Sequence, residues 1–237
     1  MNLDSAAHHD ELSKRDALLR GVAEAAQLLL ASADFDAAVN GALEAIATTA
    51  DIDRIYIFEN QLDPKTGAEV AYCPYEWTVP GIVKMREIPN RFPMVLSLFG
   101  RVTQELRAGR SVQVLARELP EPARALQALD TAVSLSIVPI VMSDGTWWGA
   151  IGCDDCTTER VWSDAEVAVL ETAAACIGSA IERDRARAER EAAAQVGAAE
   201  LETHNQQLRE RDSLLNCVNA AAQCLVANDD LSVALPA

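Results

Sequence analysis

A stretch without proline runs from Ser163 to about Val226, and it most constrains how this chain can fold. Its start carries the S-x-x-E pattern of a capping box, in which Ser163 and Glu166 satisfy each other's backbone N–H groups. Trp162 and Val167 have the spacing of a hydrophobic staple around that start. The pattern predicts one helix that would span about 90 Å, which is more than a globular domain can bury.

The composition changes along this helix. Residues up to Ile181 are largely apolar, whereas charged residues and alanine dominate from Glu182 onward. We therefore expect the first part to be the last helix of a globular domain at residues 10–182. We expect the second part, residues 183–212, to leave that domain as a coiled-coil linker, which we call the linker helix.

Leucines recur every seven residues in and just after the linker helix, at Leu201, Leu208 and Leu215. In that register Asn205 takes an a position, where asparagine fixes the alignment of parallel dimers. The alternative is a single solvated helix with mixed charges. Because a lone polar helix of this length is only marginally stable in water, we expect a parallel homodimer.

Composition and charge exclude several classes of partner. Half of the 237 residues are hydrophobic and the net charge is −16, which argues against nucleic acid or an anionic membrane as the main partner. No apolar run approaches the ~20 residues that span a bilayer. The polar tail at residues 1–9 has no signal-peptide pattern, so we expect a cytoplasmic protein whose six cysteines are reduced.

Residues 10–182 predict an α+β domain on an antiparallel sheet, because hairpin strands lie between helices. The expected strands are residues 53–62, 69–79, 82–88, 111–115, 134–142 and 146–153, with hairpin turns at 63–67 and 143–145. The expected helices begin at Asp10, at residue 35 after an Asp34 cap, and at residue 123, running to 132. Residues 92–107 read as a short helix or a lid.

The chain also contains an internal repeat. Residues 15–38 align without gaps on residues 211–234, and 12 of the 24 positions are identical. Two alanine- and leucine-rich helices can match by composition, but the shared Arg-Asp-x-Leu-Leu and Ala-Ala-Gln in one register argue for a true repeat. We therefore expect residues 213–237 to be the first helix of a second copy of the domain, cut off at Ala237.

Three motifs together resemble those of GAF domains, the small-molecule-sensing modules of bacterial signalling proteins and cyclic-nucleotide phosphodiesterases. They are Ser134–Ile140 with its S-x-x-x-x-P-I pattern, the turn and W-G at Asp144–Gly149, and Cys153–Glu166 with its R-x-W-S-x-x-E pattern. The resemblance covers residues 16–183. It implies a six-stranded antiparallel sheet with flanking helices and a ligand pocket on the opposite face. It also implies that the terminal helices dimerise and pass signals along a coiled coil to an output domain of the kinase or cyclase type.

The residues that mark known ligand classes of this family are mostly absent. No cysteine is followed by histidine, as bilin-binding members require. The cyclic-nucleotide class has Asn-Lys, Phe and Asp-Glu where this chain has Cys153-Asp154, Trp162 and Glu166. The ligand and any cofactor therefore stay unidentified. Members that reduce free methionine sulfoxide use pocket cysteines, which leaves a thiol enzyme as an alternative, and a ligand-free dimerisation scaffold is another.

The cysteines and charged residues show no catalytic or metal-binding pattern. Cys153 and Cys156 form one C-x-x-C, but no second pair and no nearby histidine accompanies it. No Ser/His/Asp set and no phosphate-binding glycine loop is present. We interpret Glu159 and Arg160 as a structural ion pair near the start of the long helix. The leading hypothesis is therefore a non-enzymatic sensor and dimerisation module of a larger bacterial signalling protein.

The resemblance places the ligand between the sheet and the segment from residue 82 to residue 106. The residues that we expect to line the pocket are Tyr56, Phe58, Tyr75, Trp77, Arg86, Phe92, Phe99, Ile137 and Trp147. They suggest a flat or partly apolar ligand, with Arg86 or Arg91 meeting any anionic group. Which face each strand residue takes depends on the register, because a slip of one residue inverts the set.

Overall fold

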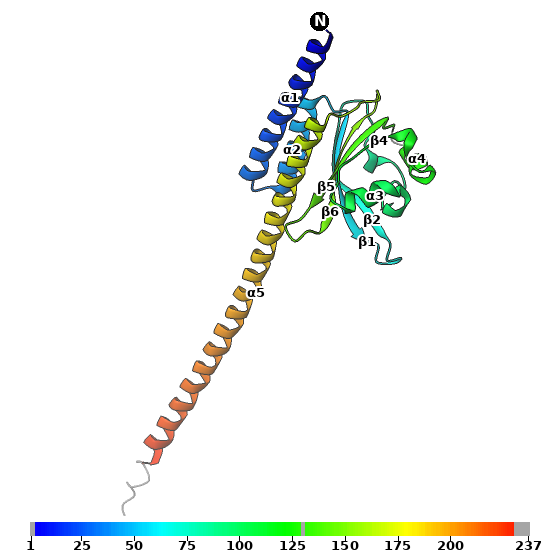
Figure 1. Cartoon of the computed structure of the whole chain (residues 1–237). Helices are drawn as coiled ribbons and strands as arrows, with labels where there is room; N and C mark the ends of the chain where they lie inside the picture. The colour runs from blue at the N-terminus through cyan, green and yellow to red at the C-terminus, as the bar shows by residue number, and fades with distance from the viewer. Residues whose placement is uncertain (1–2, 129–130, 230–237) are drawn as a thin grey trace, which may run out of the picture. The chain divides into compact units, whose positions relative to one another are not determined.

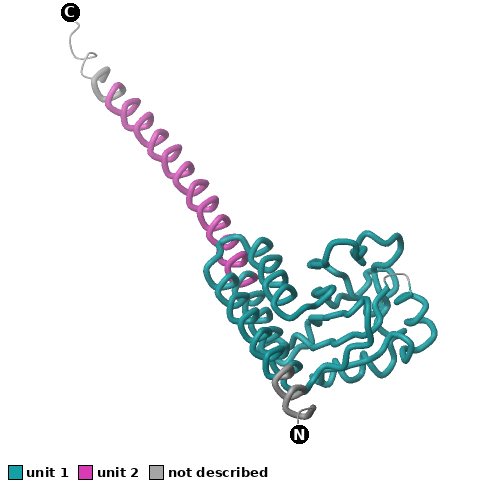
Figure 2. Tube along the Cα trace, turned by 90° about the horizontal axis from the view of Figure 1, so that it is seen from above, with its two compact units in different colours: residues 1–184 teal, residues 185–237 magenta. Residues whose placement is uncertain are grey.

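The structure is a computed structural model that describes residues 3–128 and 131–229, with only the backbone described for residues 3–11 and 225–229. The chain divides into two compact units, Met1–Asp184 and Arg185–Ala237, which Figure 2 distinguishes by colour. Within the described residues, no helix is both long enough and apolar enough to cross a membrane.

The first unit is built on one six-stranded sheet with the strand order β3-β2-β1-β6-β5-β4 (Figure 1). The strands are β1 (Arg54–Leu62), β2 (Glu69–Thr78), β3 (Met94–Val95), β4 (Val112–Leu115), β5 (Ser134–Val141) and β6 (Trp147–Asp155). All neighbouring pairs are antiparallel. The fold is the α+β architecture that the sequence predicted, with two hairpins, β1–β2 and β5–β6, meeting at the centre.

Three helices cover one face of this sheet: α1 (Leu3–Ala31), α2 (Phe35–Ala50) and the first turns of α5 (Asp164–Asp229). The starts of α2 and α5 are fixed by local hydrogen bonds that the sequence predicted. The Asp34 carboxylate accepts the N–H of Ala37 at 3.0 Å. Glu166 accepts the N–H of Ser163 at 2.8 Å, and the Ser163 hydroxyl accepts the N–H of Glu166 at 3.3 Å. The capping box is therefore confirmed.

Short elements cover the opposite face, and we call residues 85–127 the covering segment. Besides β3 and β4, it contains η1 (Met85–Glu87), η2 (Leu96–Phe99), α3 (Arg101–Arg107), η3 (Ala116–Glu118) and α4 (Glu121–Gln127). Alternation along the strands divides the core between the two faces. On β1, Ile55 and Ile57 pack with the helices, whereas Tyr56 and Phe58 pack with the covering segment.

Gly149 of the W-G motif lies where β6 passes β1 most closely. A Cβ atom at this position would lie 1.9 Å from the carbonyl oxygen of Phe58. Since that oxygen belongs to the backbone, it cannot move aside as a side-chain tip can. Glycine is therefore required here by the close approach of two strands.

Some predicted elements were wrong. Residues 82–88 form no strand, because the Glu76 carboxylate accepts the N–H of Met85 at 2.7 Å and turns the chain there into η1. The edge strand is instead β3, inside the region that was expected to be a short helix or a lid. The helix expected at residues 123–132 is α4, which ends at Gln127. The backbone of residues 3–9, expected as a polar tail, already belongs to α1.

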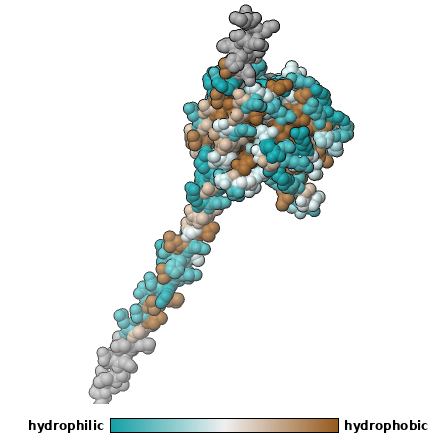
Figure 3. Space-filling view, in the orientation of Figure 1, coloured by the Kyte–Doolittle hydropathy of each residue, from teal (hydrophilic) through white to brown (hydrophobic). Residues whose placement is uncertain are grey.

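The second unit is helical through Asp229, and its described side chains are exposed except that of Ala186, which is partly buried. Apolar patches interrupt its polar surface (Figure 3). The exposed apolar side chains of this unit include Leu201 and Leu208, which are 61% and 43% exposed. Residues 211–227, which align on residues 15–31, are helical like their counterparts in α1. The last positions of the repeat, 230–234, lie outside the described residues.

Candidate functional site

A small cavity lies between the sheet and the covering segment, with a volume of about 40 Å³. Five of the residues predicted from the sequence line it: Tyr56, Phe58, Phe99, Ile137 and Trp147. Its walls are otherwise mainly apolar and include Met94, Leu96 and Leu106. A cavity of this volume holds only a few water molecules. Side chains therefore fill most of the space between the sheet and the covering segment.

Tyr75 and Trp77 do not reach this cavity, and the register of β1 and β2 explains why. Tyr56 pairs with Glu76, so these two share the cavity face. The neighbours of Glu76 on β2 then point to the opposite face, because side chains alternate along a strand. Tyr75 and Trp77 accordingly pack with the helices, and the Tyr75 hydroxyl donates to Asp36 at the start of α2.

Two further predicted residues lie outside the cavity lining. Arg86 is exposed, and its guanidinium donates to the carbonyl of Pro74 at 3.3 Å. Phe92 packs edge-on against Phe58, with ring centroids 5.9 Å apart. Phe92 therefore packs against Phe58, a residue of the cavity wall, without lining the cavity itself, whereas Arg86 lies away from the cavity.

The polar residues that line the cavity include Arg91 and Gln127, whose exposed fractions are 2% and 3%. The Arg91 guanidinium lies 3.4 Å from Gln127 Oε1 and 3.2 Å from Met94 Sδ. It also lies 5.5 Å from the centroid of the Phe92 ring, within range of a cation–π interaction. The Arg91 side chain thus places a guanidinium, the group whose geometry matches carboxylate and phosphate oxygens, in the wall of an apolar cavity.

A buried charge network borders the cavity at Tyr56. Arg54 Nη1 lies 3.1 Å from Asp154 Oδ2, and the Tyr56 hydroxyl donates to Asp154 Oδ1 at 3.1 Å. Arg54 also faces Glu76, with its Nε 3.5 Å from Oε1, and donates to the carbonyl of Val83 at 3.1 Å. The network therefore links the Tyr56 ring, which lines the cavity, to the loop at Val83, which lies just before the covering segment. The signal of this network in the sequence is the presence of charged residues inside otherwise apolar strands.

Arg107, at the end of α3, holds the covering segment over Trp147. Its guanidinium lies 5.4 Å from the centroid of the Trp147 ring and donates to Glu69 on β2. The carboxylate of Glu69 in turn has a pKa below its usual range, chiefly because it accepts this hydrogen bond. Both charged groups are about half exposed, so solvent screens this contact and leaves it weak.

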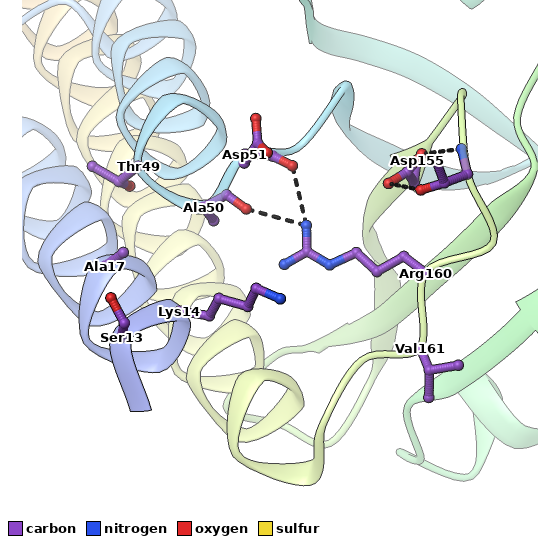
Figure 4. Close-up of a pocket in the computed structure, with 10 residues that line it drawn as sticks. Ser13, Lys14, Ala17, Thr49, Ala50, Asp51, Asp155, Arg160 and Val161 are labelled. Atoms are coloured by element: carbon purple, nitrogen blue, oxygen red, sulfur yellow. Dashed lines mark hydrogen bonds between the residues drawn. The ribbon is translucent and has the colours of Figure 1, made fainter. Parts of the chain in front are cut away.

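A larger cleft, about 440 Å³, lies among α1, the end of α2 and the loop before α5 (Figure 4). Arg160 points into it and donates to the carbonyls of Ala50 and Asp51, each at 3.1 Å, and to Glu166 at 2.8 Å. The guanidinium therefore ties the end of α2 to the first turn of α5.

The ion pair expected between Glu159 and Arg160 is not formed. Arg160 pairs with Glu166, and Glu159 pairs with Arg117 of η3. The reason is that the capping box places the Glu166 carboxylate inside the first turn of α5. The Glu166 carboxylate also lies within reach of the Arg160 guanidinium, whose Cζ atom is 3.9 Å from the centroid of the Trp162 ring.

The cysteines do not converge on one point. Cys73 packs in the cluster on the cavity face, whereas Cys153 packs with the helices on the other face. Burial raises the pKa of both thiols well above the usual range, so both stay protonated and poorly nucleophilic. Among the described residues, no three His, Cys, Asp or Glu side chains gather to hold a metal ion.

This arrangement of a curled antiparallel sheet, a helical layer and a covered cavity is that of a sensor domain. The chain belongs to the GAF family, whose GAF domain pattern matches residues 34–181, more than half of its length. The GAF domain is a non-catalytic sensor module, and the resemblance seen in the sequence motifs is thus confirmed.

Solved GAF domains share this fold. One is the GAF domain of the cyanobacteriochrome TePixJ, with 17% identity and a TM-score of 0.53 over 65% of this chain and 93% of that domain. Another is GAF3 of Slr1393 from Synechocystis sp. PCC6803, with 16% identity and a TM-score of 0.52 over 62% and 92%. At these identities the likeness shows the fold alone.

A relative with higher identity is the methanogenesis regulatory histidine kinase FilI of Methanothrix harundinacea (strain 6Ac). It is 40% identical over 184 residues, which make up 76% of this chain and 20% of that protein. The chain therefore spans about a fifth of the length of this relative. The catalytic part of the kinase lies outside the aligned region.

Proposed function

We propose that this chain is the sensor and dimerisation module of a larger signal-transduction protein, and that it binds a small molecule between the sheet and the covering segment. The observation that carries the proposal is the pair of buried polar side chains, Arg91 and Gln127, among the apolar walls of one cavity. Ligand sites typically combine a few convergent polar groups with such walls.

The chemistry of the walls narrows the class of ligand. Tyr56, Phe58 and Trp147 offer ring faces to a flat, partly apolar molecule, and Arg91 suits a carboxylate or phosphate on it. Because the cavity measures only about 40 Å³, side chains must move when a ligand enters. Met85 and Met94 flank Arg91, and methionine adapts to new shapes at low cost.

A matched pair of arginine variants tests this site. Thermal unfolding of the full chain is followed against a panel of ring compounds that carry a carboxylate or a phosphate. A compound that binds raises the unfolding midpoint by mass action. We expect the increase to persist in Arg86→Met and to vanish in Arg91→Met, since only Arg91 lines the cavity. An equal increase in Arg91→Met would place the ligand elsewhere.

A ligand-free dimerisation scaffold is the second candidate, and the small volume of the cavity favours it. In that case the aromatic side chains are core, and no compound in the panel raises the midpoint. A thiol-dependent methionine sulfoxide reductase has less support, because Cys73 and Cys153 pack on opposite faces of the sheet. Sulfoxide reduction coupled to NADPH that is lost in Cys73→Ser or Cys156→Ser would revive it.

We further propose a parallel homodimer through the linker helix and an output domain of the kinase or cyclase type elsewhere in the full protein. The heptad spacing of Leu201, Leu208 and Leu215 supports the dimer, and all three side chains are exposed in the single chain. The histidine kinase relative supports a kinase as the output. The helix α5 begins at Asp164, where Arg160 and the capping box hold its first turn, and it continues into the second unit, so we assign to it the transmission of the signal.

A further inference from the structure

The contact between α1 and α2 is unusually close at one point. The described residues of α1 that are buried are Leu18, Gly21, Val22, Ala25 and Leu29. At Gly21 an added Cβ would lie 2.0 Å from Thr49 Oγ1 and 2.8 Å from the carbonyl oxygen of Ala45. The Thr49 hydroxyl is itself held by that carbonyl at 2.5 Å, and the carbonyl belongs to the helix backbone. A side chain at position 21 therefore has no room.

The surface of α2 that meets α1 is a row of small residues spaced four apart: Gly41, Ala45 and Thr49. At Gly41 an added Cβ would lie 3.3 Å from the Leu28 side chain, so this position is also tight. Small residues at this spacing let two helices approach closely along one stripe. The groove of α2 thus accepts a helix with a particular apolar face and a glycine at its centre.

The second copy of the internal repeat reproduces that face. Leu214, Val218, Ala221 and Leu225 stand where α1 has Leu18, Val22, Ala25 and Leu29, so four of the five buried positions are identical. Of the seven differences between residues 15–31 and 211–227, five fall at exposed positions of α1 and one at the half-buried Ala17. The remaining difference is at the tightest contact, where Cys217 replaces Gly21. Leu214 and Val218 are 68% and 64% exposed in the second unit.

We propose that Leu214, Val218 and Ala221 form a docking face for a helix of the α2 type, and that Cys217 bars this face from the α2 helix of the first unit. The partner is a helix with a row of small residues four apart, with a smaller side chain where α2 has Thr49 and with its backbone far enough from position 217 to leave room for the Cys217 side chain. The helix α1 then packs with α2, and residues 211–227 pack with the partner helix. Neither first helix takes the place of the other. The partner helix would cover the exposed apolar face that contains Leu214 and Val218. The proposal does not depend on a bound ligand.

Grafting within the full chain tests the proposal. In one variant, residues 15–31 take the sequence of residues 211–227 but keep Gly21. In a second variant, the same graft also carries Gly21→Cys. A control adds Leu18→Asn and Val22→Asn to the first graft. The readout is the thermal midpoint of the first unit by tryptophan fluorescence, since all 4 tryptophans lie in that unit.

We expect the graft with Gly21 to stay within about 4 °C of the wild-type midpoint, because the buried face is unchanged. The graft with Gly21→Cys should fall at least about 5 °C further, because the new side chain overpacks the contact. The double-asparagine control should lose more than either. If the graft with Gly21 falls as far as the control, residues 211–229 are not an α1-type packing helix. If the two grafts unfold at the same midpoint, the cysteine at position 217 does not prevent packing against α2. Neither outcome bears on ligand binding or on the dimer.

Discussion

Glu166 joins three features of the first unit in one side chain. It completes the capping box of α5, pairs with Arg160 and, through Arg160, holds the end of α2. Burial pushes its pKa upward, but the N–H of Ser163 and the Arg160 guanidinium outweigh burial and leave the pKa below its usual 4.5. At the scale of single residues, this is where stability should respond most directly to a conservative change.

Replacing Glu166 with Gln should destabilise the first unit by about 2 kcal/mol at pH 7, since it removes a partly buried charge partner. The folded pKa is lowered, so the unfolded chain takes up the proton first as the pH falls. The stabilisation is therefore present above the unfolded pKa of about 4.5 and is lost as the pH falls below it. Urea unfolding from pH 7 to pH 3 should show the two proteins converging in acid, and a constant difference would contradict this assignment.

Gly149 provides a second prediction at this scale. Gly149→Ala should lower the free energy of unfolding by about 3 kcal/mol, because its Cβ meets the backbone of Phe58. Gly197→Ala is the matched control, since no atom lies within 4 Å of a Cβ at that position. Tryptophan fluorescence in urea should leave the control at the wild-type midpoint. Wild-type stability in the Gly149→Ala variant would show that the strands separate easily at this point.

At the scale of elements, the helix starts and hairpins could be predicted because they depend on local residues. Asp34, the capping box and the turn at residues 63–67 each act through hydrogen bonds within a few positions. The strand β3 could not be predicted in this way. It consists of two residues that pair with Val70 and Ala71 of β2, more than twenty positions earlier in the chain, so no local pattern marks it as a strand.

The prediction at the scale of elements concerns dimerisation through the linker helix. The double change of Leu201 and Leu208 to Lys would bury charge in the proposed seam, so the dimer should weaken at least about tenfold. Val196→Lys is the control, because Val196 is 60% exposed but lies off the heptad seam. Sedimentation velocity should show the double variant shifting toward monomer while the control stays with the wild type. A wild-type chain that is already monomeric at about 20 μM would contradict the dimer.

At the scale of the whole molecule, the family and the α+β sheet follow from the sequence, whereas the site follows only in part. Of the residues expected to bind a ligand, Tyr56 and Phe58 line the cavity, whereas Tyr75 and Trp77 do not. Neither periodicity nor composition distinguishes the two faces of β2, because the pairing of Tyr56 with Glu76 decides them. Gln127 was missed for a similar reason, since it is brought to the cavity by a helix more than sixty positions along the chain from β1.

The central claim is that the first unit holds a small molecule against Arg91. Native mass spectrometry of the full chain, purified without denaturation from its own host, tests this most directly. We predict a retained mass in the wild type that persists in Arg86→Met and is lost in Arg91→Met. A wild-type chain that carries no added mass, and that also gains none from the compound panel, would contradict the sensor and leave the ligand-free scaffold.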